Sequence, residues 1–333
     1  MIEVRTCARL HLGLLDNNGE QGRLYGSIGL AINQPHLVLK ADSADRLITE
    51  GQESDRVAEY ARRFIGHYGA PSGARLNLDT GIPSHVGLGS GTQIAMAVGT
   101  ALAALAGLRL SPREIALAVG RGMRSGIGIA TFQRGGFVLD GGHRLLSGLP
   151  APAEIDGLAG RMEKNSIPPV LFRHPVPKSW YFVTVIPKAD KGFSGEKENI
   201  AFRQLPPAPA QLVEKSSRLL LMKMLPALVE KDAVGFGQAL TDIQRMIGDF
   251  FASVQDGRFS NSLSEEMIRF MLDWGALGAG QSSWGPAVYG LVDGKMQALR
   301  LVKEVNVLLD SLGGGEIFCV QPQNRGAQVR KHA

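Results

Sequence analysis

A glycine-rich segment at residues 83–92, with the sequence PSHVGLGSGT, carries the clearest chemical signal in the chain. Glycine lets backbone N–H groups approach an anion without obstruction from a Cβ atom. A helix is expected to follow, and the start of a helix offers unpaired N–H donors and the positive end of its dipole. The segment therefore predicts a cradle for a pyrophosphate or a triphosphate, and a tight packing turn is the alternative interpretation.

Other common ligand-binding patterns are missing from the sequence. There is no G-x-x-x-x-G-K-[ST] run, which argues against a P-loop, and no G-x-G-x-x-G opens a helix, so a Rossmann dinucleotide site is not indicated. Cys7 and Cys319 are the only cysteines and lie far apart. They predict neither a disulfide framework nor a cysteine-based zinc site.

The first half of the chain is expected to mix strands and helices around this segment. Residues 1–50 are typical of a β-meander of short strands, and residues 56–68 predict a helix. The helix after the glycine-rich segment should end at Gly107. A further helix should begin at residues 111–114 (SPRE), a capping box with proline at the first helical position. Residues 135–146 predict a hairpin that turns at two glycines.

Six prolines between residues 150 and 177 indicate an irregular stretch, and we place a domain boundary between residues 155 and 156. The second half predicts helices alternating with strands, and residues 262–265 (SLSE) should cap one of the helices. The predicted strands cover residues 180–186, 287–292 and 316–320, and the predicted helices cover residues 211–230, 232–250, 262–274 and 295–312. The fold class is therefore α+β.

Composition is that of an ordinary globular protein, with 44% hydrophobic and 20% charged residues in 333. The net charge of +5 comes without a long basic run, so we expect no nucleic-acid partner, whereas an anionic small-molecule substrate fits the charge well. The longest strongly apolar helical stretch, residues 94–108, falls short of the ~20 residues of a membrane span. Neither a signal peptide nor a membrane partner is indicated, and we expect a cytoplasmic protein.

Three segments resemble the GHMP kinases in order and spacing. Residues 83–92 resemble the signature P-x-x-x-G-L-G-S-S-A, with Gly91 and Thr92 in place of the second serine and the alanine. Residues 8–16 (ARLHLGLLD) resemble the first motif of the family, and residues 275–285 (GALGAGQSSWG) resemble its C-terminal glycine motif. Together these segments span nearly the whole chain.

This resemblance implies the GHMP-kinase fold. Residues 1–155 would form a ribosomal-protein-S5-domain-2-like N-terminal domain that carries the phosphate-binding loop, and residues 156–333 a ferredoxin-like α/β C-terminal domain. The resemblance leaves open whether the chain is a kinase. Mevalonate kinases have a segment S-G-I-D whose aspartate can act as the catalytic base, but Gly128 stands at that position here and cannot accept a proton.

A narrower resemblance favours another activity. Residues 9–14 (RLHLGL), 135–137 (GGF), 195–198 (GEKE) and 280–286 (GQSSWGP) resemble the β-ribofuranosylaminobenzene 5′-phosphate synthases, and the last run is the most specific. The resemblance implies transfer of phosphoribosyl from phosphoribosyl pyrophosphate (PRPP) to 4-aminobenzoate or 4-hydroxybenzoate, with decarboxylation and pyrophosphate release, in methanopterin-type cofactor biosynthesis.

Two other functions stay open at this point. Homoserine kinases also lack the aspartate, so an ATP-dependent small-molecule kinase is the alternative activity. A non-enzymatic nucleotide-binding protein of the same fold is a third interpretation, and the polar residues Arg9, His11 and Gln281 argue against it.

The resemblance also implies roles for individual residues. The pyrophosphate loop would consist of Gly87, Leu88, Gly89, Ser90, Gly91 and Thr92. Catalytic roles fall to Arg9, His11 and Gln281, with His11 as a hydrogen-bond donor or a proton shuttle near neutral pH. Further substrate contacts are expected from Arg134, Lys191, Gly278, Gly280, Ser282, Ser283 and Trp284.

A magnesium ion is the expected cofactor, and no organic cofactor is expected. Asp16, Glu196 and Glu198 are the candidate ligands, because Mg²⁺ takes one or two carboxylates together with phosphate oxygens and water. Each of the three could equally be a solvated surface acid. Trp284 could stack on the aromatic acceptor or belong to the core. A homodimer is the default expectation for the assembly.

Overall fold

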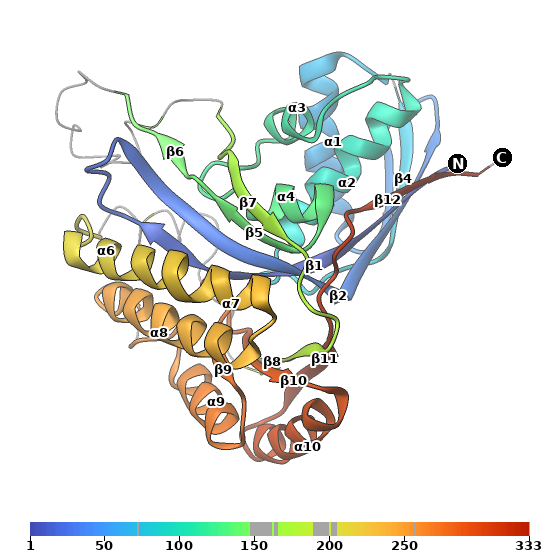
Figure 1. The fold of residues 1–333 in the computed structure, drawn as a ribbon. Coiled ribbons are helices and arrows are strands. Elements are labelled where there is room, and N and C mark those ends of the chain that lie inside the picture. Colours follow the sequence, from blue (N-terminus) through green and yellow to red (C-terminus); the bar gives the residue numbers. More distant parts are fainter. Residues whose placement is uncertain are drawn as a thin grey trace.

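The computed structural model describes residues 1–71, 73–146, 162, 166–188, 200, 205–255 and 257–332. Two long antiparallel strands, β1 (Ile2–Asp16) and β2 (Arg23–Ser43), run through the first half (Figure 1). Residues 1–50 thus contain strands as predicted, but the expected meander of short strands is wrong. Both strands bury a run of side chains along their length, and continuous pairing of the two keeps that apolar surface covered.

The register between β1 and β2 shifts at two places, between Cys7 and Arg9 and between His11 and Gly13. Such bulges bend a strand and re-aim the side chains beside them. Arg9 and His11, two of the predicted site residues, lie directly at these irregularities.

The first sheet has eight strands, in the order β12-β1-β2-β4-β3; β5 and β6 also pair with β2, and β7 pairs with β5. The shorter strands are β3 (Ile48–Gly51), β4 (Ala74–Thr80), β5 (Phe137–Asp140), β6 (His143–Arg144), β7 (Val170–His174) and β12 (Gln328–Lys331). Strands β7 and β12 come from the second of the two predicted sequence ranges. Because β12 pairs with β1, the two ends of the chain lie close together (Figure 1).

The hairpin predicted for residues 135–146 is wrong, because β5 and β6 each pair with β2 and not with each other. The backbone N–H of Gly142 donates to the Asp140 carboxylate at 2.9 Å, and Gly142 has a φ of 61°. A Cβ atom on Gly142 would lie 2.2 Å from the carbonyl oxygen of Leu24, so the chain passes tightly along β2 here.

Four helices cover one face of the first sheet: α1 (Ser54–Tyr68), α2 (Ser90–Leu105), α3 (Pro112–Ala118) and α4 (Ile127–Arg134). The capping box at Ser111 and Glu114 is confirmed, with both of its reciprocal hydrogen bonds present. Helix α2 begins within the glycine-rich segment, at Ser90, and most of its small side chains are buried.

The second sheet is antiparallel, in the order β11-β8-β10-β9. Its strands are β8 (Trp180–Pro187), β9 (Gly278–Gln281), β10 (Val288–Asp293) and β11 (Gly315–Val320). The helices of this half are α6 (Ala210–Leu219), the π-helix η2 (Leu220–Met224), α7 (Leu225–Glu230), α8 (Ala233–Phe251), α9 (Ser262–Asp273) and α10 (Lys295–Ser311). The α+β class predicted from the sequence is confirmed.

The predicted cap of α9 is wrong by one residue. Asn261, not Ser262, is the N-cap, because its side-chain oxygen accepts the backbone N–H of Ser264 at 2.8 Å.

Helix α8 packs on both β1 and β9 and so joins the two sheets. Within the parts of the chain that the structure describes, no helix combines the length and the apolar character needed to cross a membrane.

Candidate active site

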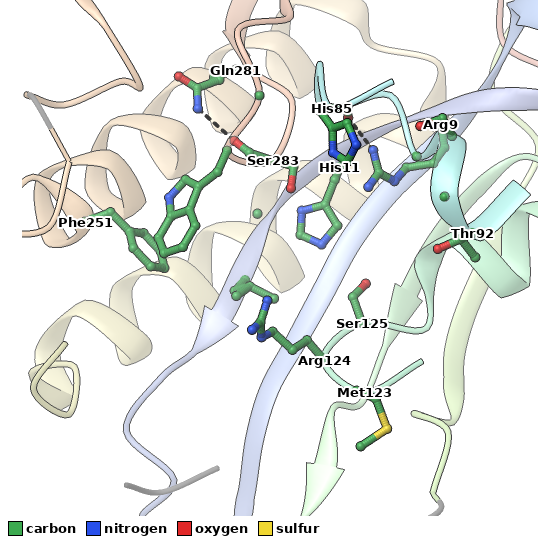
Figure 2. A pocket seen from close by; sticks show the side chains of 18 of the residues that line it. Arg9, His11, His85, Thr92, Met123, Arg124, Ser125, Phe251, Gln281 and Ser283 are labelled. Atoms are coloured by element: carbon green, nitrogen blue, oxygen red, sulfur yellow. Dashed lines mark hydrogen bonds between the residues drawn. The ribbon is translucent and has the colours of Figure 1, made fainter. Parts of the chain in front are cut away.

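A cavity of about 580 Å³ lies where β1, the start of α2, the segment before α4, helix α8 and residues 281–285 meet (Figure 2). Its size is in the range that holds a small-molecule ligand. Figure 2 shows His11 projecting from β1 into the space between Arg9 and Arg124. The three segments that carry the family resemblance therefore lie around one site.

The carbonyl oxygen of Gly87 holds these segments together. It accepts hydrogen bonds from the guanidinium of Arg9 and from the hydroxyl of Ser282, the latter at 2.7 Å. Gly87 has a φ of 93°, and a Cβ atom there would lie 2.1 Å from the carbonyl oxygen of Ser282. Any other residue at Gly87 would be strained and would also push the two segments apart.

The glycine-rich segment ends in the first turn of α2, as predicted. Gly89 is the N-cap, with a φ of 84°, and no side-chain hydrogen bond caps this helix. The backbone N–H of Thr92 donates to the carbonyl oxygen of Gly89 at 3.1 Å, so the N–H groups of Ser90 and Gly91 are the first-turn donors available to a ligand. Ser90, Gly91 and Thr92 all line the cavity. Leu88 does not line it, because its side chain is fully buried in the core.

The cavity is strongly cationic. Five arginines line it: Arg9, Arg56, Arg121, Arg124 and Arg258. The imidazoles of His11 and His85 line it as well. Among the described residues of its wall, none is Asp or Glu. A concave surface with charges of one sign concentrates ligands of the opposite sign, so this geometry suits a polyanion.

His11 is held neutral. Burial lowers the pKa of its imidazole to about 3, and the positive charge of Arg9 lowers it further in the same direction. Its backbone N–H donates to the hydroxyl of Ser282 at 3.0 Å, which fixes the strand at this point. A pKa this far below its ordinary value disfavours His11 as a proton shuttle near neutral pH, whereas a neutral imidazole can still donate a hydrogen bond.

The other end of the cavity is apolar and aromatic. Trp284 and Phe251 meet edge to face, with ring centroids 5.0 Å apart and planes at 87°. Leu14, Ile247 and Phe259 line the same cavity. Trp284 is a core residue, 7% exposed, as one of the two interpretations has it, and it also forms part of the cavity wall. Its stacking on an aromatic acceptor stays a prediction.

Gln281 forms part of the wall, but its amide group is used internally. Its Oε1 accepts the backbone N–H of Ser260 at 2.7 Å, and its Nε2 donates to the carbonyl oxygen of Ser283 at 2.8 Å. Ser283 lines the cavity and has a φ of 58°. The hydrogen bond from the Gln281 side chain helps to hold this backbone conformation. The geometry therefore fits Gln281 as a positioning residue for the turn.

Two predicted glycines serve packing rather than the ligand. A Cβ atom on Gly278 would lie 2.2 Å from the carbonyl oxygen of Gly237 on α8, and one on Gly280 would lie 2.5 Å from the Gln244 side chain. Neither glycine lines the cavity. Gln244 in turn donates to the carbonyl oxygen of Leu12 and accepts from the N–H of Gln281, so it ties β1 to β9.

Two more predicted residues lie away from the cavity. Arg134 ends α4, outside the wall, and its carbonyl oxygen accepts from Arg173 at 2.9 Å. The carboxylate of Asp16 accepts the backbone N–H groups of Asn18 and Gly19 and so closes the turn after β1. The bonds at Asp16 explain that carboxylate without a ligand.

Lys191, Glu196 and Glu198 lie outside the described residues. Among the described ones, no cluster of three or more His, Cys, Asp or Glu side chains could hold a metal ion. Carboxylate ligation of magnesium therefore stays a prediction. The described wall near the phosphate loop offers the hydroxyls of Ser90 and Thr92 instead.

The sequence analysis missed a buried carboxylate behind the site. Burial raises the pKa of Asp140, against hydrogen bonds from Ser27 and from the backbone of Gly142 and Gly126 that lower it. The hydroxyl of Ser27 also lies 2.7 Å from that of Ser125, which lines the cavity. Asp140 thus positions Ser125 and the start of α4.

The sequence analysis also missed Arg56, Arg121 and Arg124 as wall residues. Arg121 and Arg124 stand in a run with glycines at 120, 122 and 126, between two helices. Arginine interleaved with glycine at a helix junction is typical of an anion site, and this signal could have indicated them. Arg56 lies near the start of a helix distant in sequence, and no local pattern indicates it.

Comparison with known proteins places the chain in a family. The GHMP kinases N terminal domain matches residues 55–136, and the GHMP kinases C terminal domain matches residues 224–307. Beta-ribofuranosylphenol 5'-phosphate synthase from Methanothermobacter thermautotrophicus is 35% identical over 98% of both chains. The enzyme of that name from Archaeoglobus fulgidus is 38% identical over 88% of both. The chain belongs to this synthase family.

Solved structures agree with the fold. A homoserine kinase from Cytophaga hutchinsonii has a TM-score of 0.65 at 17% identity. The match covers 99% of this chain and 97% of the homoserine kinase. The L. major mevalonate kinase in complex with R-mevalonate has a TM-score of 0.68 at 16% identity. The match covers 97% of this chain and 96% of the mevalonate kinase. At such identities the likeness shows the fold alone. The predicted GHMP-kinase fold is confirmed, and membership of the synthase family makes the chain an enzyme.

The buried, neutral state of His11 predicts how stability depends on pH. The folded pKa of about 3 lies below the unfolded value near 6.5, so the unfolded chain binds a proton first as the pH falls. Lowering the pH from 7 to 4 should therefore reduce the free energy of unfolding, and His11→Gln should remove part of that dependence. Urea denaturation at each pH measures it, and an identical pH dependence in both proteins would contradict a buried neutral His11.

Proposed function

We propose that this chain transfers the phosphoribosyl group of PRPP to a para-substituted benzoate, with release of pyrophosphate and CO2. The observation that carries the proposal is the division of one cavity into two ends. The start of α2 with Arg9, Arg56 and Arg121 suits the anionic donor, and Trp284 with Phe251 suits an aromatic acceptor.

The names of the relatives support one acceptor over the other. They are called synthases of a ribofuranosylphenol 5'-phosphate. A phenol product follows from 4-hydroxybenzoate after loss of its carboxylate, whereas 4-aminobenzoate would give an aniline. We therefore propose 4-hydroxybenzoate as the preferred acceptor and 4-aminobenzoate as the close analogue.

The proposed reaction balances without a net proton transfer. The bond between the anomeric carbon and its oxygen breaks, and its electron pair leaves with pyrophosphate. The ring carbon that bears the carboxylate forms a bond to the anomeric carbon. The bond to the carboxylate then breaks, its electron pair restores the aromatic ring, and CO2 departs. A neutral His11 and a described wall without Asp or Glu agree with such chemistry.

The protein's own contribution is then charge and position. Donors at the first turn of α2 and the arginine side chains stabilise the negative charge that develops on the departing pyrophosphate. The apolar wall at Trp284 holds the ring against the sugar and excludes water from the cation-like anomeric carbon. The guanidinium of Arg9 donates a hydrogen bond to the carbonyl oxygen of Gly87 and adds positive charge at the phosphate-loop end of the cavity.

Magnesium fits this scheme as an ion carried by the substrate. When bound, Mg²⁺ would neutralise charge on the pyrophosphate, and it commonly takes its ligands from phosphate oxygens and water. Ser90 and Thr92 are the described side chains that would hold it beside the loop. Glu196 and Glu198 stay predicted ligands.

A specific contact argues against the mevalonate-kinase type of the alternative, which depends on an aspartate at the position of Gly128. The homoserine-kinase type has no such aspartate and is tested by the ATP incubation below. A Cβ atom on Gly128 would lie 2.8 Å from Cγ2 of Thr92, so Thr92 occupies the space that a larger side chain at Gly128 would need. Thr92 itself stands where the kinase signature has alanine. The position that holds the aspartate base in mevalonate kinases therefore has no carboxylate here, and Thr92 occupies the space that such a side chain would need.

The direct test is one incubation of the protein with PRPP, Mg²⁺ and carboxyl-labelled 4-hydroxybenzoate. We expect labelled CO2 and pyrophosphate in equal amounts, and slower release with 4-aminobenzoate. A parallel incubation with ATP, homoserine and mevalonate should yield no ADP. ADP formation without CO2 release would replace the proposal with the kinase alternative.

Substitution at the aromatic end should separate the two substrates. Trp284→Leu removes the ring edge from the cavity wall, so we expect the KM for the benzoate to rise at least about fivefold while the KM for PRPP changes little. Trp274→Leu is the matched control, because Trp274 is 48% exposed and lies outside the wall. A rise confined to the KM for PRPP would show that the ends are assigned the wrong way round. Melting temperatures of both variants report any general loss of stability.

A further inference from the structure

Gly91 leaves room for two guanidinium groups at the start of α2. A Cβ atom on Gly91 would lie 2.7 Å from Nη2 of Arg56 and 2.9 Å from Nη2 of Arg121. Both distances are shorter than nonbonded contacts allow, so the two arginines occupy space that exists only because residue 91 has no side chain. Gly91 is also the position at which the chain departs from the serine of the GHMP kinase signature.

Each guanidinium is also held by contacts with other residues of the protein. Nη1 of Arg56 donates to Oε2 of Glu53 at 3.0 Å and to the hydroxyl of Ser84 at 2.7 Å. The guanidinium carbon of Arg121 lies 4.9 Å from the centroid of the Tyr60 ring. These contacts fix the two side chains while one terminal nitrogen of each remains beside Gly91.

The pair concentrates positive charge at one point of the cavity wall. Burial would raise the pKa of Glu53, but hydrogen bonds from Arg56 and Ser84 hold it below its usual value, so this carboxylate stays ionised. It balances the charge of Arg56. Both guanidiniums line a cavity whose described wall carries no acid, and two guanidiniums beside the same glycine are stabilised when an anion lies between them.

We propose that Arg56 and Arg121 form a clamp for the terminal phosphate of the departing pyrophosphate, and that Gly91 determines specificity by admitting it. The assignment of the ligand rests on the proposed function, in which the first turn of α2 receives pyrophosphate. The clamp adds one terminal guanidinium nitrogen from each arginine to the backbone donors of that turn. A serine or alanine at residue 91 would displace both guanidiniums and leave the backbone donors in place.

The substitution Gly91→Ala tests this without endangering the fold. The atoms that the new Cβ would meet are the ends of flexible side chains, which can move. Gly91 lies in the first turn of α2 and is not among the residues with positive φ, so alanine is compatible with the helix and favours it. Gly66→Ala is the matched control, because Gly66 lies in α1 with nothing within 4 Å of its added Cβ.

Isothermal titration of the full chain with inorganic pyrophosphate and with ribose 5-phosphate, each with Mg²⁺, provides the readout. We expect Gly91→Ala to weaken pyrophosphate binding at least about tenfold, with ribose 5-phosphate within about twofold of the wild type. Gly66→Ala should bind both like the wild type. Equal pyrophosphate affinity in wild type and Gly91→Ala would overturn the clamp, and so would a loss confined to ribose 5-phosphate.

A double-mutant comparison separates the clamp from a general disturbance of the loop. In the background Arg56→Ala with Arg121→Ala, the added Gly91→Ala should cost little further affinity, because it acts only through those side chains. An undiminished loss in that background would also overturn the clamp. These titrations need no acceptor, so failure to release CO2 contradicts only the proposed function. Normal turnover with pyrophosphate binding insensitive to Gly91→Ala contradicts only the clamp.

Discussion

The site depends on one backbone oxygen. The carbonyl of Gly87 accepts a guanidinium from Arg9 on β1 and a hydroxyl from Ser282 after β9. A Cβ atom on Gly285 would lie 2.1 Å from the carbonyl carbon of Val86, so the backbone at Gly285 is also packed directly against the backbone of the glycine-rich segment. Because the contacts leave no room for side chains, three segments distant in sequence are held in one geometry, and the start of α2 opens into a cavity bounded by all three.

Under the proposed function, the chain shares the fold of the GHMP kinases but carries out a different reaction, and this constraint accommodates the difference. The loop still presents the start of a helix to an anion, as the family signature predicts. Around it, Gly91 admits two arginines, Thr92 closes the space beside Gly128, and burial keeps His11 neutral. The result is a surface for holding and stabilising charge rather than for moving protons, which suits a reaction whose leaving group is a polyanion.

The sequence indicates best what depends on local patterns. The glycine-rich segment, the capping box at Ser111 and strand β8 follow from residues adjacent in the chain, and the structure has all three. The separation of β5 from β6 could not be predicted, because both pair with a strand more than 90 residues earlier. Arg56 reaches the site only through the packing of α1 beside α2, so no spacing in the sequence indicates it.

Isolated glycines show the same limit. Gly278 and Gly280 belong to a run that resembles a ligand motif, yet their lack of a side chain serves the close approach of α8. Conversely Gly91, which departs from the family signature, adjoins the two arginines. Only the neighbours of a glycine in space distinguish these cases.

A crystal structure of the protein with PRPP and Mg²⁺ tests the central claim most directly. The account predicts that the diphosphate lies on the backbone of residues 87–92 beside Arg9, with the anomeric carbon directed toward Trp284 and Phe251. A diphosphate bound elsewhere, or a ribose whose anomeric carbon points away from the aromatic end, would contradict it.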